Sequence, residues 1–434
     1  MKRICLVLAI LALPALLFAA GSNQQQSASG SGGYLRLAWW GNTTRDERTV
    51  RLAQLFMDKN PGVTVETEPT QWDGYWQKMN TQAAAGSLPD VMQQDVSYIK
   101  QYTDRNQLVD LNAYAQRKII DLSHWADAGL SAGILDGKLV GLVLGTNAPG
   151  MGYDVGVLQK AGVTIDDTTW TWADYERIAL QIYQKTGVQT CPPGPTQFRM
   201  VMEHTTRQGG IGLFSKDEKS LGMTNNQAAY DGWKLVLDIN NRLRAAGALY
   251  DPEDTYVMGR AMEEMPLAQG KTWNDFFWSN QYIGQSAAAK RELQYVMIPA
   301  VVQEKAPFGT YFRPSQYISM LATSKDKDLS AKFINFFVND LEANRILLAE
   351  RGIPIPTDVR EDLYGRVDAG NKFLFDFITH ITPYISPTDP PYPMRSGEAE
   401  DAMRPIVLQA LLGRISSDDA MKQIIQAANT VLTR

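Results

Sequence analysis

Residues 34–67, YLRLAWWGNTTRDERTVRLAQLFMDKNPGVTVET, contain a strand, a helix and a second strand. Leu35, Leu37 and Trp39 alternate with their neighbours in the period-two pattern of a β-strand. Apolar residues then recur at helical spacing up to residue 57, and an Asn-Pro-Gly turn at 60–62 ends that helix. Residues 63–67 alternate again. The resulting βαβ unit predicts a parallel sheet covered by helices.

Helix and strand patterns continue along the chain. Thr171 and Asp174 are spaced as a helix-capping pair, and Gly187 follows as the stop signal. The last third of the chain is predicted to be almost wholly helical, with Pro-rich interruptions at 353–356 and 383–393. Further helices are predicted at 72–85, 171–185, 226–246, 329–338, 341–350 and near 421–432, and short strands at 88–92 and 295–298. The pattern therefore predicts an α/β fold.

Length and composition limit the domain number and the class of partner. The chain has 434 residues, of which 44% are hydrophobic and 21% are charged. This length suits about two or three lobes, each large enough to bury a full core. The formal net charge of -5 offers no basic surface for counterion release on nucleic acid. Nucleic acid and anionic membranes are not expected partners.

The N-terminus has the pattern of an export signal. Lys2 and Arg3 precede an apolar run that ends in small residues, which predicts a secretory signal peptide over 1–22. Residues 23–33 contain only small and polar side chains, so they are expected to form a flexible leader. The exit resembles a lipoprotein signal, but Ser22 stands where the lipid-bearing cysteine would be. After cleavage the chain would have a net charge of -7 and one cysteine, Cys191. The protein is expected to be periplasmic or extracellular.

Residues for common catalytic sites are scarce. His124, His204 and His380 are far apart, and the sequence has neither a zinc-protease nor a nucleophile-elbow motif. Gly270-Lys271-Thr272 ends like a phosphate loop, but Met265 replaces the required first glycine. We therefore expect no metal, no cofactor and no enzymatic activity. A glycosidase remains an alternative, because its two carboxylates come from segments that are distant in sequence.

A series of short segments over nearly the whole chain resembles the extracellular solute-binding proteins, family 1, of bacterial ABC importers. The order and spacing of the segments carry the resemblance, whereas no single one is specific. Leu144 departs from it, standing where many members have proline. The segments are WW at 39–40, NPGVTVE at 60–66, AGSLPDV at 85–91, LVDL at 108–111, DGKLVGL at 136–142, GYD at 152–154, AGV at 161–163, TWTW at 169–172, residues 267–280, SK at 324–325, AKF at 331–333 and RGIP at 351–354.

This resemblance implies a type II periplasmic binding protein fold, in which two discontinuous α/β lobes enclose a central ligand cleft. Lobe 1 would hold residues 34–145 and 301–355, and lobe 2 residues 146–300 and 356–434. The implied function is capture of a carbohydrate, as an oligosaccharide, for delivery to the membrane subunits of an ABC importer. The protein is expected to act as a monomer.

A sugar presents apolar C–H faces to aromatic rings and hydroxyls to planar polar groups, so the site should combine both kinds of side chain. Ligands of open α/β sheets bind at the carboxyl ends of strands, and the family commonly places its sugar contacts in several of these segments. The candidate ligand-binding residues are Trp39, Trp40, Asn42, Gln94, Asp95, Asn147, Trp273, Asp275, Phe276, Trp278, Tyr311, Arg313 and Arg395. A secreted glycoside hydrolase and a binder of a non-sugar solute remain the alternatives.

Overall fold

The computed structural model describes residues 32–434 except 42, 195–196, 258–260, 306–307 and 387–391. The predicted signal peptide, most of the predicted leader and Asn42 lie outside these residues. The strands are β1 (Tyr34–Trp40), β2 (Thr64–Thr70), β3 (Val91–Gln94), β4 (Ile134–Leu135), β5 (Lys138–Leu139), β6 (Leu142–Asn147), β7 (Pro149–Asp154), β8 (Asn274–Trp278), β9 (Leu293–Val296) and β10 (Arg313–Met320).

Helices make up most of the remaining regular structure. The α-helices are α1 (Thr43–Lys59), α2 (Trp72–Ala84), α3 (Ile99–Asp104), α4 (Asn112–Gln116), α5 (Asp127–Ser131), α6 (Val155–Ala161), α7 (Trp172–Thr186), α8 (Gln197–Gln208), α9 (Gln227–Ala245), α10 (Pro252–Thr255), α11 (Tyr282–Ala289), α12 (Lys327–Asn339), α13 (Leu341–Leu347), α14 (Thr357–Tyr364), α15 (Ala369–Ile381), α16 (Ser396–Leu411) and α17 (Ser417–Leu432). Short 3-10 helices are η1 (Gly222–Asn225), η2 (Met262–Glu264), η3 (Ser279–Gln281), η4 (Gln303–Lys305) and η5 (Thr382–Tyr384).

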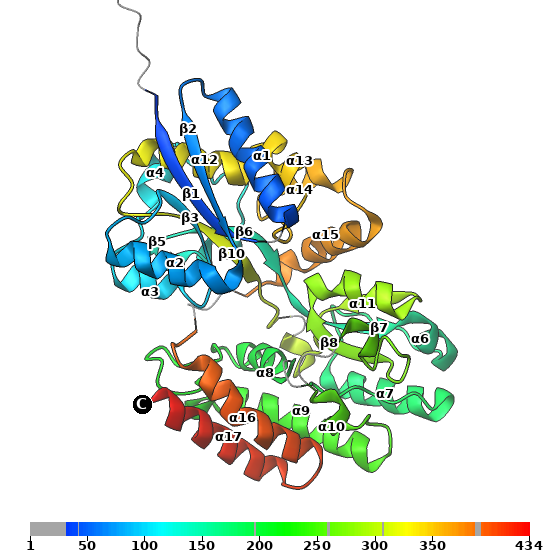
Figure 1. The fold of residues 1–434 in the computed structure, drawn as a ribbon. Helices are drawn as coiled ribbons and strands as arrows, with labels where there is room; N and C mark the ends of the chain where they lie inside the picture. The colour runs from blue at the N-terminus through cyan, green and yellow to red at the C-terminus, as the bar shows by residue number, and fades with distance from the viewer. Residues whose placement is uncertain (1–31, 42, 195–196, 258–260, 306–307, 387–391) are drawn as a thin grey trace, which may run out of the picture.

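Lobe 1 is built on a sheet with the strand order β2-β1-β3-β10-β6 (Figure 1). The predicted βαβ unit is present, because β1 pairs in parallel with both β2 and β3. The sheet as a whole is mixed, however, because β10 runs antiparallel to β3 and β6. Strand β10 was not predicted, since Arg313–Met320 has no regular alternation and its pairing with β6 contains register irregularities.

The pleat of β1 divides the lobe 1 core into two layers. Leu35, Leu37 and Trp39 pack on one side with residues of α1 and α12, where Phe56 meets Phe333 edge to face at a centroid distance of 5.0 Å. Ala38 and Trp40 pack with residues of α2 in a separate cluster. Successive side chains of a strand point to opposite faces, so the two neighbouring tryptophans of β1 have different surroundings.

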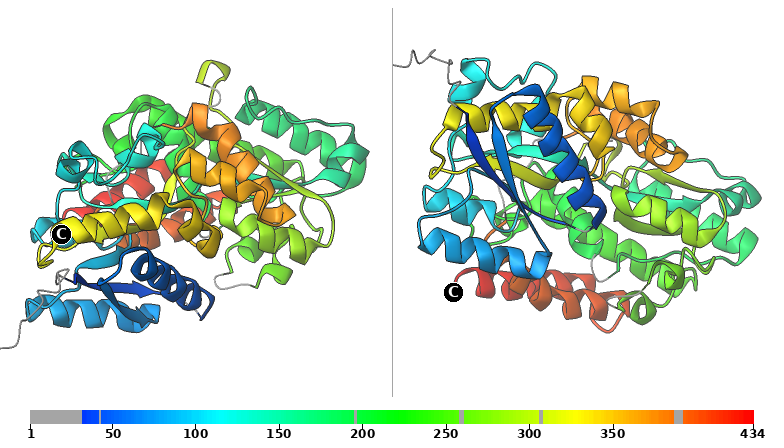
Figure 2. Two further views of the ribbon diagram at one scale, coloured as in Figure 1. Left: turned by 90° about the horizontal axis from the view of Figure 1, so that it is seen from above. Right: turned by 45° about the horizontal axis from the view of Figure 1, so that its top comes forward.

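Lobe 2 is built on an antiparallel sheet with the strand order β8-β7-β9. Helices α7, α8, α9, α16 and α17 supply most of the core on one side of it. Figures 1 and 2 show α16 and α17 side by side at the C-terminal end of the molecule. On the other side, Phe377 of α15 meets Tyr295 of β9 at 4.8 Å.

Local end signals of the helices were predicted well. Thr171 and Asp174 form the expected capping box of α7, and Gly187 ends that helix in the left-handed conformation. The structure has similar caps at Asn226 of α9 and Ser416 of α17, which the ranges predicted above did not specify. Each of these ends is specified by a hydrogen bond within a few residues of sequence, which makes it readable without tertiary information.

Two strands lie a few residues from their predicted positions. Strand β3 covers 91–94 rather than 88–92, because Pro89 has no N–H for ladder pairing. Strand β9 covers 293–296 rather than 295–298, because the N–H of Met297 donates to the carboxylate of Asp167 at 3.0 Å. With its shift, β3 ends at Gln94.

The chain passes between the lobes directly from β6 to β7, again from β9 to β10, and once more beyond α13. At the crossings, Ile353 and Thr146 exchange backbone hydrogen bonds, and the N–H of Ser386 donates to the carbonyl of Thr310. Phe312 and Ile353 pack with α15 rather than with the lobe 1 core. The numerical lobe boundaries stay a prediction.

No helix among the described residues is long and apolar enough to cross a membrane.

Candidate functional site

The crossing from β6 to β7 brings three of the candidate residues together. Asn147, the last residue of β6, is opposite Arg313 at the start of β10. Two residues later, Pro149 of β7 is opposite Trp278, the last residue of β8. The two sheets therefore place Asn147, Trp278 and Arg313 on neighbouring strand ends where the lobes meet.

Trp278, Arg313 and Tyr311 are in direct contact at this point. The guanidinium carbon of Arg313 lies 4.8 Å from the centroid of the Trp278 ring, and Tyr311 meets that ring edge to face at 6.0 Å. Trp278 and Arg313 are half-buried, whereas Tyr311 is buried. The arrangement places an aromatic ring beside a planar cation at the crossing of the lobes.

Beneath this contact lies a buried glutamate network formed by Glu203, Arg207, Tyr311 and Tyr392. The hydroxyls of Tyr311 and Tyr392 donate to Glu203 Oε2 at 2.9 and 2.6 Å. Arg207 lies 3.4 Å from Glu203 Oε1 and stacks over the Tyr311 ring at 4.3 Å. Burial and the nearby Glu203 charge raise the pKa of Tyr392 to about 12, so its hydroxyl stays protonated as a donor.

Sequence reasoning missed this network, although a signal was present in α8. Arg199, Glu203 and Arg207 recur at a spacing of four, which puts three charged side chains on one stripe of the helix. Arg199 pairs with Glu400 at 2.7 Å and stacks over Tyr392 at 4.9 Å. A charged stripe within a largely buried helix would have pointed to this site.

Tyr392 also lines a cavity of about 510 Å³ between the lobes. Lobe 1 contributes Lys100 and residues 134–136, and lobe 2 contributes residues 210–212 and 214–216, Glu218 and Pro393. Lys100 Nζ lies 3.9 Å from Glu218 Oε1, so an ion pair bridges the lobes at this cavity. We call it the interlobe cavity.

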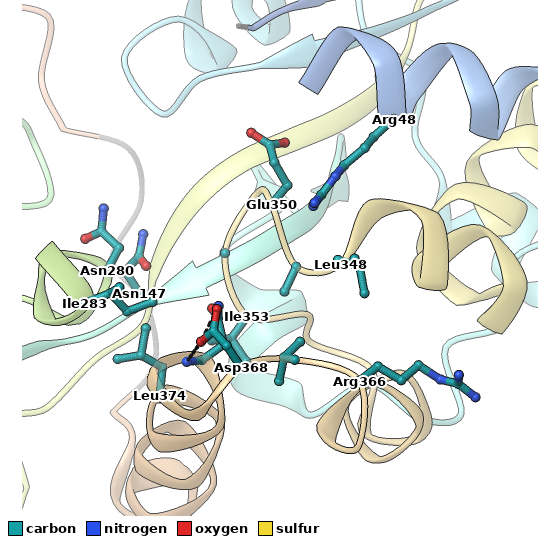
Figure 3. Close-up of a pocket in the computed structure, with 14 residues that line it drawn as sticks. Arg48, Asn147, Asn280, Ile283, Leu348, Glu350, Ile353, Arg366, Asp368 and Leu374 are labelled. Atoms are coloured by element: carbon teal, nitrogen blue, oxygen red, sulfur yellow. Dashed lines mark hydrogen bonds between the residues drawn. The ribbon is translucent and has the colours of Figure 1, made fainter. Parts of the chain in front are cut away.

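A second cavity of about 410 Å³ lies where Asn147 and Ile353 form the crossing, and we call it the hinge cavity (Figure 3). Lobe 1 supplies Arg48 and Glu350, and Asn280 lies beside Asn147 in the view. The remaining polar lining comes from Arg366, Asp368 and Asn371. Asn147 is thus the candidate residue that lines this cavity.

The lobe 1 candidates lie at the carboxyl ends of β1 and β3. Trp40 is 8% exposed and belongs to an aromatic cluster with Trp72, Tyr75 and Trp76 at centroid distances of 5.1, 5.2 and 5.5 Å. Trp72 is 42% exposed, and Trp76 stacks on Tyr98 at 3.8 Å. Trp72 was not predicted as a site residue, although it begins α2 two residues after the end of β2 and offers the accessible ring of this cluster.

Gln94 and Asp95 end β3 beside that cluster. Gln94 is fully buried, and its amide atoms have no hydrogen-bond partner among the residues that the structure describes. Asp95 is half-buried and accepts a hydrogen bond from the N–H of Ser97 at 2.9 Å. One carboxylate oxygen of Asp95 is therefore engaged at the start of α3.

Four predicted site residues lie in the cores instead of at a cleft. Trp39 donates to Asp46 at 2.8 Å in the lobe 1 core, and Trp273 donates to Thr190 at 2.8 Å in the lobe 2 core. Phe276 is buried with Trp273. Asp275 is 3% exposed, and burial raises the pKa of its carboxyl to about 7.

The extent of β8 explains these corrections. The strand covers 274–278, so Trp278 alone ends it, and its preceding residues are enclosed by neighbouring strands and helices. Trp39 points into the α1 side of the sheet, opposite to Trp40.

Arg395 is half-buried just before α16, and Asn42 lies outside the described residues. We therefore remove Trp39, Trp273, Asp275 and Phe276 from the candidate set.

Comparisons with known proteins identify the fold and the family. A family model described as bacterial extracellular solute-binding protein matches residues 51–363. A family 1 extracellular solute-binding protein from Alicyclobacillus acidocaldarius has a solved structure that is 25% identical, with a TM-score of 0.82, and the match covers 92% of this chain and 98% of that one. The two-lobed α/β binding-protein fold expected from the sequence is thereby confirmed.

More distant structures share the fold alone. A periplasmic oligogalacturonide binding protein from Yersinia enterocolitica is 18% identical with a TM-score of 0.77, over 92% of this chain and 99% of that one. Among curated relatives, an arabinooligosaccharide-binding protein from Bacillus subtilis is 22% identical over 62% of this chain and 66% of its own length. Three putative binding proteins from Brucella match over 26% of this chain and only 28% of their own length, at 27% identity.

Proposed function

Because the chain belongs to the bacterial extracellular solute-binding protein family, we propose that it captures an oligosaccharide between its lobes and delivers it to the membrane subunits of an ABC importer. The observation that carries the proposal is the contact of Trp278 with Arg313 at the crossing of the lobes. The site lies beside the glutamate network, whose Tyr392 lines the interlobe cavity. The family and the predicted export signal support a periplasmic or extracellular location.

The chemistry of the site suits a sugar. Trp278 and the exposed ring of Trp72 provide surfaces for C–H faces, and Asp95, Asn147 and Arg313 provide planar polar groups for hydroxyls. The interlobe cavity has a volume of about 510 Å³, within the range of ordinary small-molecule sites, about 300–1,000 Å³. Trp278 and Arg313 do not line it, but Trp278 is connected to it through Tyr311, Glu203 and Tyr392. Relatives described as binding arabinooligosaccharide and oligogalacturonide support a carbohydrate over other solutes.

Binding and transport would be coupled by closure of the lobes. A ligand that contacts both lobes favours the state in which both sets of contacts form, and hinge closure of this kind is established for periplasmic binding proteins. The Lys100–Glu218 pair already bridges the lobes in this structure. The closed form would then present a defined surface to the importer.

The contacts of Glu203 favour binding over glycoside hydrolysis. A catalytic carboxyl must exchange a proton with the substrate or attack it. Glu203 instead accepts hydrogen bonds from two tyrosines and faces Arg207. These contacts hold its carboxylate as a structural acceptor.

Fluorescence titration with mono- and oligosaccharides tests the proposal, with chromatography of the mixtures after incubation. We expect saturable binding of at least one oligosaccharide and no new reducing ends. New reducing ends would identify a hydrolase, and a folded protein that responds to no saccharide would identify a binder of another solute.

A further inference from the structure

Among the described residues Arg313 has no acidic partner, in contrast to Arg199 and Arg207 of the neighbouring helix α8. Arg199 pairs with Glu400 at 2.7 Å, and Arg207 lies 3.4 Å from Glu203. For Arg313, no ion pair or hydrogen bond of the guanidinium is formed with any residue in the described part of the chain; its contact is the Trp278 ring. Arg313 is therefore a half-buried positive charge that no described residue neutralises by direct contact.

Because the guanidinium of Arg313 forms no hydrogen bond with a described residue, its donors are available to a ligand. A guanidinium above an aromatic ring uses its ring-facing surface, whereas its N–H groups point outward in the plane of the fork. A carboxylate matches that fork with two parallel hydrogen bonds. Because Trp278 also offers a surface for a sugar ring, one ligand unit that carries both a ring face and a carboxylate would satisfy both side chains.

Asp95 is the acidic group that could compete for this position. The charges of Asp95 and Arg313 both act on the hydroxyl of Tyr317, so the two side chains belong to the same region. They form no ion pair within 4.0 Å, and Asp95 instead accepts from the N–H of Ser97. Tyr392 is likewise committed to Glu203. Neither side chain neutralises Arg313 directly.

We infer that the ligand is an acidic oligosaccharide, and that Arg313 binds the carboxylate of a uronic acid unit whose ring lies against the Trp278 side of the site. The inference rests on the proposed function, because it specifies the substrate class of the same site. It makes Arg313 the residue that distinguishes acidic from neutral sugars.

The first test uses the unaltered protein and two matched pairs of ligands. Calorimetric titration compares trigalacturonic acid with its methyl ester, and an aldotetraouronic acid with its carboxyl-reduced form. We expect one acid to bind at least about tenfold more tightly than its uncharged counterpart, a difference of about 1.4 kcal/mol. Neutral maltotriose is titrated as a further ligand. If each acid binds no more tightly than its uncharged counterpart, or if maltotriose alone binds, the inference is overturned and the proposed function still stands. A folded protein that binds no saccharide overturns both.

The second test assigns that selectivity to Arg313. Arg313→Gln should weaken binding of both ligands, but the affinity for the acid should fall about tenfold more than the affinity for its uncharged counterpart. Arg313→Lys should recover only part of this additional loss because it lacks the fork. Arg117→Gln, in an exposed pair with Asp328, is the matched control. Equal loss for both ligands would show a general positioning role and overturn the assignment. If the variants fail to fold, the comparison on the unaltered protein still decides the inference.

Discussion

Asp275 is a carboxyl whose surroundings disfavour its charge. Burial raises its pKa from an ordinary 3.8 to about 7, although the N–H of Phe276 and the thiol of Cys191 oppose that shift. The folded protein thus holds a proton that the unfolded chain releases between these pH values. This contribution to stability is fully present below pH 3.8 and is lost as the pH rises to about 7.

Asp275→Asn should therefore remove a pH-dependent component of the free energy of unfolding. The amide can keep the oxygen that accepts from Phe276. We expect the variant to gain stability over the unaltered protein as the pH rises from 4 to 7.5, by up to about 4 kcal/mol. Urea unfolding at several pH values measures the difference, and two parallel stability profiles would contradict the expected titration.

Trp278 is the candidate whose ring is both accessible and placed at the crossing. Trp278→Ala should weaken oligosaccharide binding by about 1–3 kcal/mol with the fold intact. Fluorescence titration and a thermal melt measure the two properties, and Tyr364→Ala, an exposed aromatic change on α14, is the control. An unchanged affinity would remove Trp278 from the site.

At the scale of elements, α8 supplies Glu203 and Arg207, which fix the positions of Tyr311 and Tyr392 in the glutamate network. Glu203→Gln removes a buried charge that faces Arg207 and two tyrosine hydroxyls. We expect a loss of about 3–5 kcal/mol in the free energy of unfolding, as for one partner of a buried pair. Glu176→Gln, whose partner Arg242 is exposed, should cost about 1 kcal/mol or less. Comparable losses in both variants would contradict a structural role specific to Glu203.

The α7 cap is a smaller and separable element. Thr171 accepts from the N–H of Asp174, and Asp174 accepts in return from the backbone of Thr171. Thr171→Ala should cost about 1 kcal/mol, and Thr171→Ser should restore most of it. Chemical denaturation of the unaltered protein and the two variants measures these differences. Both variants lack the threonine methyl, so equal losses of stability would show that the methyl rather than the capping hydroxyl is responsible.

The two kinds of element differ in how far the sequence predicts them. The α7 cap, Gly187 and the alternation of β1 depend on neighbouring residues, so they were predicted correctly. The position of β10 in the lobe 1 sheet depends on pairing with distant strands. The same limit applies to the candidate site. Trp278 and Arg313 are both predicted as ligand-binding residues and stay so, but the sequence does not predict their contact, nor that Trp273 is buried just before β8.

At the scale of the whole molecule, the chain crosses between lobes that each have their own sheet and core. Few short segments then connect them, which allows one lobe to move relative to the other. Saturating oligosaccharide should reduce the radius of gyration measured by small-angle X-ray scattering, because the ligand favours the closed state. Identical scattering with and without a ligand of proven affinity would contradict closure.

We expect the protein to bind a saccharide where its lobes meet and to release it unchanged. Isothermal titration calorimetry of the protein with a panel of acidic and neutral oligosaccharides, followed by chromatography of each recovered ligand, tests it most directly. The claim predicts one-site saturable binding of at least one oligosaccharide, recovered unchanged. Absence of binding across the panel by a folded protein, or recovery of shortened products, would contradict it.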